Sequence, residues 1–276
     1  MQFMADAGGK RRFANSITAR KDHDYFRVWC IEVCQFITDY RIEIRNDARV
    51  EPCGAVCTIM PGYVVHNFTV AQAYACYAFD MKQRLHVIYV AGIGDHAMLG
   101  QRAVVASWRL WGVDAEVVPM LWAVNETWEA KFDRLLQRID DCASKGQPVA
   151  LVGVSAGATA VINAFAARKA VIVGCALIAA KVNHPETIGE QYNREAPAFI
   201  PAAYGCEAAL ETLSDTDRAR ILSRYSRLDS VVTIADSHVA GATNRELAIS
   251  GHTLTIATQI IFAAPFFLRF LRRCMR

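Results

Sequence analysis

The sequence predicts an α/β fold, in which a mostly parallel sheet is flanked by helices on both faces. From residue 85 onward, short apolar runs alternate with segments of helical length. Strands separated by helices of this length return in parallel, so they build a parallel sheet. The runs are almost continuously apolar, which is typical of strands covered on both faces. With 276 residues, 53% of them hydrophobic, the chain can bury a core of that size.

The individual elements follow from the apolar patterns and the breakers between them. Short apolar runs predict strands at residues 85–90, 114–120, 148–154, 170–180, 220–226 and 244–249. Helical spacing predicts helices at residues 96–111, 126–143 and 156–169. Lys145-Gly146 ends the second of these helices. A last apolar segment, Leu254–Leu271, predicts a packed terminal helix that is kinked at Pro265.

Two parts of the chain depart from this alternation. Residues 1–80 are interpreted as an N-terminal extension with possible early strands, because two β-runs flank a Pro61-Gly62 turn. Residues 81–276 then form the main domain. Within it, residues 181 to about 220 contain no clear strand, and such an insertion between strands predicts a lid over a site.

The ends of the chain bear on its location. The N-terminus lacks the apolar segment of a secretory signal, and Leu254–Leu271 contains Thr, Gln, Pro and Arg, which makes it a poor membrane span. A cytoplasmic protein is therefore expected. The basic, acid-poor stretch Lys10–Lys21 leaves a transit peptide or a disordered tail as alternatives.

The charge and the cysteines exclude several kinds of partner. The net charge is only +3 and no basic stripe with interleaved aromatic residues occurs, so nucleic-acid binding is not expected. Nine cysteines are scattered along the chain. Cys30/Cys34 and Cys53/Cys57 are each four apart, but no histidine or further cysteine pair completes a zinc set nearby. Buried thiols in a reducing compartment are predicted, with no metal site.

The C-terminal basic residues carry the one indication of a membrane. Four arginines lie beside phenylalanine and leucine in the ending FFLRFLRRCMR, namely Arg269, Arg272, Arg273 and Arg276. Such a segment could lie weakly on an anionic membrane surface. The alternative is a terminal helix with a solvated basic end, since arginine is common near helix C-termini.

A candidate nucleophile, Ser155, lies where a predicted strand meets a predicted helix. The sequence there is Gly153-Val154-Ser155-Ala156-Gly157. A Gly-x-Ser-x-Gly pattern between strand and helix is typical of a sharp turn that exposes a nucleophilic serine. Anything larger than glycine at positions 153 or 157 would collide with neighbouring backbone. The alternative interpretation is a turn of small residues that packs the next helix closely.

A serine hydroxyl needs a general base, and the base needs a carboxylate to orient it. His252 follows the last predicted strand and opens the terminal helix, which makes it the expected base. Asp229 and Asp236 are the candidate acids. Asp229 is favoured, because 23 residues separate it from His252 and leave room for a connection and a strand. Asp236 takes the role if the strand is instead Val231–Ala235.

The oxyanion of an acyl-transfer reaction needs backbone N–H donors. One donor is expected from Ala156, the residue after the nucleophile. The other is expected from the loop after the first regular strand, Ala91-Gly92-Ile93-Gly94-Asp95, with Ile93 as the choice. The alternative is that this loop is a plain glycine turn.

Taken together, these motifs resemble the α/β-hydrolase family. GVSAG, YSRLDSVV and GATNRELAISGH fall in the family's order of nucleophile, acid and base, and the last two look most like its short lipase- and carboxylesterase-like branch. The resemblance covers about residues 85 to 270. It implies a serine nucleophile, a histidine supported by aspartate, and ester-type chemistry without a cofactor. The family often has His-Gly where this chain has Ala91-Gly92.

A carboxylic-ester hydrolase with Ser155, Asp229 and His252 is therefore the predicted activity. Met120 and Trp122 follow a strand end and Phe199 belongs to the expected lid, so they predict a pocket for an apolar acyl or aromatic group on a small ester. Ordinary core packing is the alternative for these three residues. A thioesterase, amidase, peptidase or acyltransferase would share the same triad, and a non-catalytic binding protein could share the fold.

Overall fold

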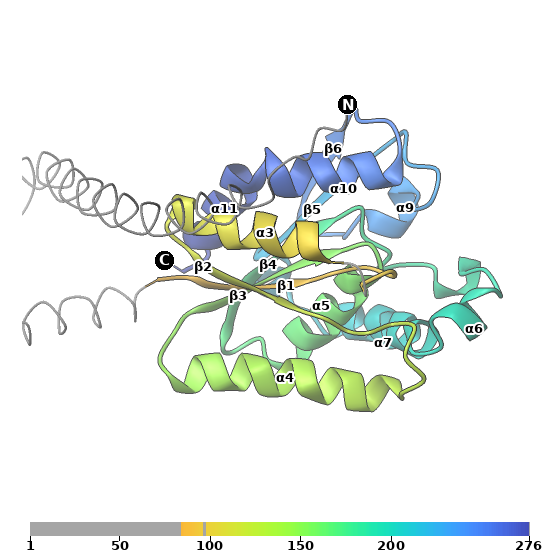
Figure 1. Ribbon diagram of the computed structural model, residues 1–276, viewed down its shortest axis with the longest axis horizontal. Helices are drawn as coiled ribbons and strands as arrows, with labels where there is room; N and C mark the ends of the chain where they lie inside the picture. The colour runs from red at the N-terminus through yellow and green to blue at the C-terminus, as the bar shows by residue number, and fades with distance from the viewer. Residues whose placement is uncertain (1–83, 96–97, 276) are drawn as a thin grey trace, which may run out of the picture. The chain divides into compact units, whose positions relative to one another are not determined.

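The computed structural model describes residues 84–95 and 98–275, which form a six-stranded sheet between two layers of helices (Figure 1). The interpretation of residues 1–80 lies outside the described residues, as do the β-runs around Pro61-Gly62 and the cysteines at positions 30, 34, 53 and 57. The predicted start of the catalytic domain at residue 81 also lies outside the described residues, which cover that domain from residue 84 onward except residues 96–97 and 276.

All neighbouring strands of the sheet are parallel. The strands are β1 (His86–Val90), β2 (Asp114–Val118), β3 (Val149–Val154), β4 (Ile172–Ile178), β5 (Ile221–Ser226) and β6 (Thr243–Leu247). Each overlaps a strand predicted from the sequence. Their order across the sheet is β2-β1-β3-β4-β5-β6, so the chain first moves to one side of β1 and then to the other. Such a switch in direction leaves a crevice at the carboxyl ends of the two central strands, here β1 and β3.

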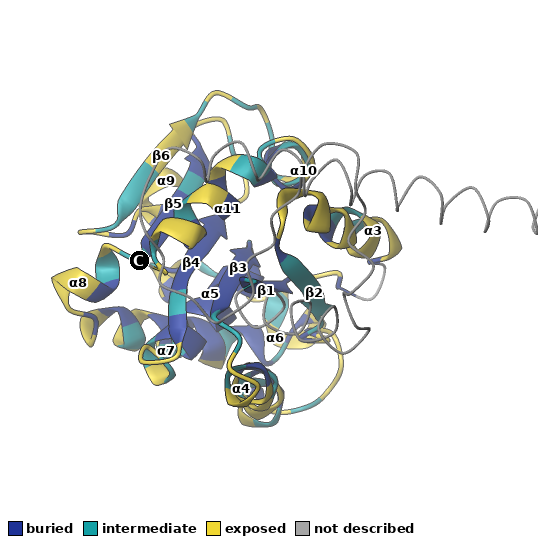
Figure 2. Ribbon diagram, turned by 90° about the vertical axis from the view of Figure 1, so that its left-hand side faces the viewer, coloured by how far each residue is buried: buried dark blue, intermediate teal, exposed yellow. Residues whose placement is uncertain are grey.

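Helices cover both faces of the sheet (Figure 1). On one face lie α3 (Leu99–Ser107), the 3-10 turn η1 (Trp108–Trp111), α10 (His252–Ile261) and α11 (Ala264–Arg273). On the other lie α4 (Trp128–Ser144), α5 (Ala156–Ala167) and α7 (Phe199–Glu211). Figure 2 shows the central strands β1, β3 and β4 buried between helices whose outer sides are exposed, whereas β2 and β6 are less buried. The two-layer cover explains why β1, β3 and β4 are apolar at nearly every position, whereas β2 and β6 carry charged residues.

Strand β1 illustrates how the two cores divide. Ile88 and Val90 pack with α4, α5 and α7, whereas Val87 and Tyr89 pack with α3 and α11 on the opposite face. All four side chains are fully buried. Removing each such side chain from water stabilises the fold by roughly 1.5–3 kcal/mol, so this strand strongly favours a central position.

The sequence of α4 explains its bounds. Thr127 caps its start, because the Thr127 Oγ1 accepts a hydrogen bond from the Ala130 N–H at 3.3 Å. Buried side chains then recur at helical spacing, at Trp128, Lys131, Leu135, Ile139 and Cys142. The helix ends before Gly146, whose φ of 74° lies in the left-handed region that glycine tolerates best.

The terminal helix breaks where Pro265 predicts it. α10 and α11 are separated by a bend of 66°, and Pro265 occupies the first turn of α11. Among the described helices, none is long and apolar enough to cross a membrane by itself, and only the bent α10–α11 pair reaches that length and composition. The α11 side chains of Phe267, Leu268 and Leu271 are buried in the core. Membrane contact through the basic end of α11 remains a prediction.

The segment expected to be a lid contains helices and no strand. It comprises η2 (Pro185–Thr187), α6 (Tyr192–Glu195), α7 and α8 (Asp215–Arg218). α7 packs against α5, with Ala202 and Cys206 fully buried, so α7 belongs to the helix layer of the fold. Residues 181–198, which precede α7, are the part that stays a lid candidate.

Candidate active site

Ser155 occupies a strained turn between β3 and α5. Its φ of 51° and ψ of −126° lie in a region that L-residues rarely adopt, at a cost of about 1–3 kcal/mol. The Ser155 N–H donates to the Ile178 carbonyl at 3.0 Å, which fixes the turn to the end of β4. The Ser155 carbonyl accepts from the Ala158 N–H at 3.1 Å. Strand, turn and helix therefore occur at this serine as the motif requires.

The two glycines of the motif are required by close backbone contacts. A Cβ at Gly153 would lie 2.6 Å from the Ala158 Cα, inside the first turn of α5. A Cβ at Gly157 would overlap the Val90 carbonyl oxygen and lie 2.5 Å from that of Ala91. Any side chain at either position would push α5 away from the sheet. The turn can present Ser155 only because both positions lack a side chain.

Ser155, His252 and Asp229 lie in one chain of hydrogen bonds. The His252 Nε2 is 3.0 Å from the Ser155 Oγ, and the His252 Nδ1 is 2.7 Å from the Asp229 Oδ2. An ionised carboxylate only accepts, so Nδ1 carries the hydrogen and Nε2 is free to accept from the serine. Of the four described histidines, His252 is the one that contacts Ser155. We refer to these three side chains as the serine–histidine–aspartate chain.

The loop after β5 holds Asp229 rigidly. Its Oδ1 accepts hydrogen bonds from the N–H groups of Val231 at 2.9 Å and Val232 at 3.0 Å. The Asp229 side chain is only 1% exposed, whereas that of His252 is 15% exposed. The Gly251 N–H donates to the Leu228 carbonyl at 3.0 Å, which brings the residue before His252 to the residue before Asp229. The acid is thus shielded from water while the base remains reachable.

Asp236, the other candidate acid, lies in a different environment. It belongs to the short helix α9 (Ile234–Ser237), where it forms a capping box with Thr233. Its Oδ1 accepts a hydrogen bond from the Lys181 Nζ, and both side chains of this ion pair are less than 10% exposed. Burial opposes ionisation, but the bonds from Lys181 and Thr233 outweigh it and lower the pKa of the Asp236 carboxyl. The structure therefore brings Asp229, and not Asp236, to His252.

The two expected oxyanion donors belong to segments that adjoin Ser155. Ala156 is the first residue of α5, so its N–H has no acceptor within the helix. The loop after β1 lies against the serine, because a Cβ at Gly92 would be 2.9 Å from the Ser155 Cβ and 3.4 Å from its Oγ. Ile93 follows Gly92 and is exposed. Its role as a donor remains a prediction.

The three predicted pocket residues are buried. Met120, Trp122 and Phe199 belong to the same core cluster as Ala156. The Trp122 ring meets the Phe199 ring edge-on at a centroid distance of 5.8 Å, and the Trp122 Nε1 donates to the Ala91 carbonyl at 3.1 Å. Trp122 therefore holds the start of the loop after β1, and Phe199 packs against Trp122. Contact with a substrate remains a prediction for all three.

Two charged residues that the sequence patterns do not single out connect the loops around this crevice. The buried Asp95 accepts a hydrogen bond from the Leu121 N–H at 2.5 Å, and the Lys131 Nζ donates to the Leu121 carbonyl. Leu121 has a φ of 54°, so both of its backbone groups are held in an unusual conformation. Lys131 occupies a position in the apolar stripe of α4, and that irregularity is the available sequence signal. Asp95 has no comparable sequence signal, because acidic residues are common in turns.

Comparisons with known proteins agree with this architecture. Est1E from Butyrivibrio proteoclasticus is 13% identical over 69% of this chain and 90% of its own, with a TM-score of 0.51. A structure of ferulic acid bound to Est1E is 14% identical over 68% of this chain and 90% of that chain, with a TM-score of 0.53. A structure from a study of LipS and LipT, two metagenome-derived lipolytic enzymes, gives 15% identity over 69% of this chain and 94% of that chain, with a TM-score of 0.49.

No protein-family model matches the chain, and no curated protein is similar to it in sequence. The fold can nevertheless be assigned from the strand order, the helices on both faces and the similarity to the Est1E structures. This chain has the α/β-hydrolase fold.

Proposed function

We propose that the protein is a serine hydrolase that cleaves carboxylic esters through an acyl-enzyme intermediate. The observation that carries the proposal is the serine–histidine–aspartate chain, with bonds of 3.0 Å and 2.7 Å, at the carboxyl edge of a parallel sheet. A serine in hydrogen-bond contact with a histidine that is itself oriented by a carboxylate is the arrangement that activates a hydroxyl nucleophile.

Acylation starts when the Ser155 Oγ attacks the acyl carbon. The His252 Nε2 takes the hydroxyl proton and becomes an imidazolium. Asp229 stabilises that positive charge by accepting the Nδ1–H bond, while two backbone N–H groups hold its Oδ1 in place. His252 then gives the proton to the leaving alcohol, which departs as the acyl–Ser155 ester remains. Water, activated by His252, releases the acid and restores Ser155.

Backbone N–H groups stabilise the oxyanion in both steps. The Ala156 N–H at the start of α5 is one donor, and its position at a helix N-terminus adds a favourable dipole. The Ile93 N–H is the other donor, supplied by the loop that approaches Ser155 at Gly92. Loss of one such donor typically costs about 100–1,000-fold in kcat, so this loop should contribute substantially to the rate.

The substrate is expected to be a small ester with an apolar or aromatic acyl part. Aromatic residues underlie the crevice, since Trp122 contacts Phe199 at 5.8 Å and stacks parallel to Trp128 at 6.3 Å. Est1E, which has the same fold, binds the aromatic carboxylic acid ferulic acid. Residues 181–198 begin beside the nucleophile, because the Lys181 N–H lies 3.4 Å from the Ser155 carbonyl oxygen. We assign to them the role of a lid that selects the acyl group.

Labelling with a fluorophosphonate probe tests the nucleophile. The wild type should be labelled, and Ser155→Ala should not be labelled at all. Ser144→Ala is the matched control, because the exposed Ser144 hydroxyl contacts only the Asp141 carbonyl near the end of α4. A wild type that is never labelled, or a Ser155→Ala variant labelled as strongly as the wild type, overturns the proposal.

A substrate panel tests the ester specificity. p-Nitrophenyl esters of increasing acyl length, one feruloyl ester, an acyl-CoA and an anilide should be compared at equal concentration. We expect the highest kcat/KM for an ester and no turnover by Ser155→Ala. A higher kcat/KM for the thioester or the anilide would keep the serine mechanism but replace the proposed reaction, because the triad is shared by all these enzymes and the pocket decides between them.

A further inference from the structure

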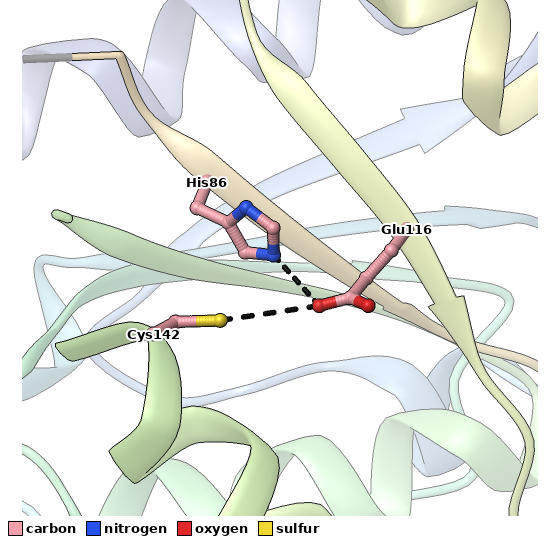
Figure 3. Close-up of side chains that lie close together, drawn as sticks. All are labelled: His86, Glu116 and Cys142. Carbon is pink, nitrogen blue, oxygen red and sulfur yellow. Dashed lines mark hydrogen bonds and ion pairs between the residues drawn. The ribbon is translucent and has the colours of Figure 1, made fainter. Parts of the chain in front are cut away.

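A second cluster of chemically active side chains, drawn in Figure 3, lies near the amino ends of the strands, away from Ser155 at the carboxyl end of β3. His86 begins β1, Glu116 lies in β2, and Cys142 lies in the last turn of α4. One nitrogen, one oxygen and one sulfur atom of these residues lie within 4.8 Å of one another. His86 pairs in register with Val149 at the start of β3, so Ser155 is roughly 20 Å farther along the sheet at 3.3 Å per residue.

We propose that His86, Glu116 and Cys142 bind one thiophilic divalent cation, Zn²⁺ in the first instance. Imidazole nitrogen, carboxylate oxygen and thiolate sulfur are the three donor types that Zn²⁺ takes in proteins. Three protein donors leave a fourth tetrahedral position for water or for a further ligand. The proposal does not depend on the proposed hydrolase activity.

The distances in the cluster are close to those that zinc requires. The His86 Nε2 is 2.7 Å and the Cys142 Sγ 3.9 Å from the same atom, the Glu116 Oε1. Around a tetrahedral zinc with bonds of about 2.0–2.3 Å, neighbouring donor atoms are roughly 3.3–3.6 Å apart. The carboxylate therefore has to shift by less than ~1 Å to admit the cation. Figure 3 shows the three side chains pointing toward one another from three different elements.

The orientation of His86 is already fixed for ligation through Nε2. Its other nitrogen, Nδ1, lies 3.2 Å from the Asp114 Oδ2. Asp114 is also the residue directly paired with His86 across β1 and β2. A histidine that binds a metal through one nitrogen usually donates its other N–H to a carboxylate, which fixes the ring and raises its basicity. Asp114 is thus in the position of such a supporting residue.

Arg138 is compatible with a bound cation. Its Nε donates to the Glu116 Oε1 at 2.7 Å, so a bound cation would share this carboxylate with a guanidinium. Arg138 and the two other side chains of the cluster all contact Oε1, so a cation bound there requires Arg138 to move to the second carboxylate oxygen, which can also accept. The charges also balance: the thiolate and two carboxylates carry three negative charges, and Zn²⁺ with Arg138 carries three positive ones.

Metal binding also requires loss of the Cys142 thiol proton and a route from solvent to the cluster. Zinc binds the thiolate form of cysteine, so the cation has to displace the proton of the Cys142 thiol. The Cys142 residue is fully buried and the His86 side chain is 5% exposed, whereas the Glu116 side chain is 30% exposed. A cation can therefore reach the cluster past Glu116. Once bound, it would connect strand β2 to α4.

Zinc titration of the metal-free full chain, in competition with a chromophoric chelator, tests the proposal. Cys142→Ser and Glu116→Gln should each weaken binding at least about tenfold, and Asp114→Asn by roughly 10–100-fold. Cys274→Ser is the matched control, because Cys274 directly follows α11 and lies outside the cluster. In parallel, Co²⁺ should give a thiolate-to-metal charge-transfer band in the wild type and the control that is lost in Cys142→Ser.

Two results would overturn the zinc site. One is equal zinc affinity in the wild type and Glu116→Gln, a variant of conserved size at the partly exposed position. The other is a charge-transfer band that persists in a folded Cys142→Ser protein, as judged by circular dichroism. If Cys142→Ser does not fold, the Glu116→Gln and Asp114→Asn affinities decide the question. Fluorophosphonate labelling of Ser155 should be the same with and without zinc, which separates this proposal from the hydrolase proposal.

Discussion

Asp229 and Asp236 both follow β5 and are seven positions apart, yet the carboxylate of one faces an imidazole and that of the other an ammonium group. Both accept hydrogen bonds from nearby backbone N–H groups, two in Asp229 and one in Asp236. The remaining oxygen of Asp229 faces the imidazole of His252, whereas that of Asp236 faces the ammonium of Lys181. An imidazole can gain and lose a proton near neutral pH, but an ammonium keeps its charge.

The difference separates a carboxylate suited to chemistry from one suited to holding structure. Asp229 can stabilise a charge that appears and disappears on His252 during a reaction. Asp236 instead connects two loops: its carbonyl accepts from the N–H groups of Val182 at 3.0 Å and Asn183 at 3.1 Å, while its carboxylate holds Lys181. Two aspartates close together in the sequence thus have different roles because different side chains contact their carboxylates.

The largest expected effect is on activity, in Asp229→Asn. The asparagine amide can donate to Nδ1 and stabilise the wrong tautomer of His252, so kcat/KM for a p-nitrophenyl ester should fall by about 10⁴-fold. The protein should stay folded, because the side chain keeps its size. Steady-state kinetics of the purified variant give the measurement.

Asp236→Asn is the matched control for that loss. The same chemical change seven positions away should leave kcat/KM within about tenfold of the wild type at a temperature where the variant is folded. If Asp236→Asn lost more activity than Asp229→Asn, the assignment of the two carboxylates would be reversed.

The sequence distinguishes these two residues only through chain length. The favoured acid, Asp229, depends on the need to fit a strand before His252, and β6 (Thr243–Leu247) does occupy that interval. The alternative strand Val231–Ala235 does not occur, since Thr233 starts the short helix α9 by capping it. The Lys181 partner of Asp236 is 55 positions away, so no local pattern could reveal the ion pair.

The strands could be predicted because they depend on local sequence patterns. The zinc cluster could not, because it depends on contacts between residues far apart in the sequence. An apolar strand is a local property, and every predicted strand from residue 85 onward has its counterpart in the sheet. His86, Glu116 and Cys142 come from three elements, and their spacing in the chain follows no metal-binding pattern. The role of α7 in the helix layer also depends on its packing against α5, which periodicity does not describe.

A smaller effect, on stability, is expected from Lys181→Met. The substitution leaves the ionised Asp236 buried without its cation, which should lower the free energy of unfolding by about 3–5 kcal/mol. Equilibrium unfolding in urea measures the change. The double variant Lys181→Met/Asp236→Leu should be more stable than Lys181→Met alone, because it removes the uncompensated charge. A double variant less stable than Lys181→Met would show that Asp236 stabilises the fold mainly through its capping bonds.

The hydrogen bonds between Thr233 and Asp236 should contribute less to the free energy of unfolding than the Lys181–Asp236 ion pair. The Asp236 N–H donates to the Thr233 Oγ1 at 3.2 Å, and the Thr233 N–H donates to the Asp236 Oδ2 at 2.8 Å. Thr233→Ala removes the first bond and the one that the Thr233 hydroxyl donates to the Asp236 Oδ2 at 2.8 Å, but keeps the second, so it should cost about 1 kcal/mol in the free energy of unfolding. Thr233→Ser, which keeps the hydroxyl, should cost less than Thr233→Ala in the same urea experiment. Equal losses in both variants would assign the effect to the methyl group.

Acidification should produce the smallest effect and should act on Asp236 through its ion pair. The folded state lowers the pKa of this carboxyl below its ordinary value of 3.8, so its ionised form stabilises the protein above that pH. The contribution is lost as the pH falls through the folded-state pKa. The gap in unfolding free energy between the wild type and Asp236→Asn should therefore be constant near neutral pH and narrow below about pH 4. Asp217, whose pKa is lowered to about 2 by bonds from Ser214 and Arg220 despite its partial desolvation, is present in both proteins and cancels in the difference. A gap that stayed constant down to about pH 3 would mean that Asp236 owes its stabilising effect to its hydrogen bonds and not to its charge.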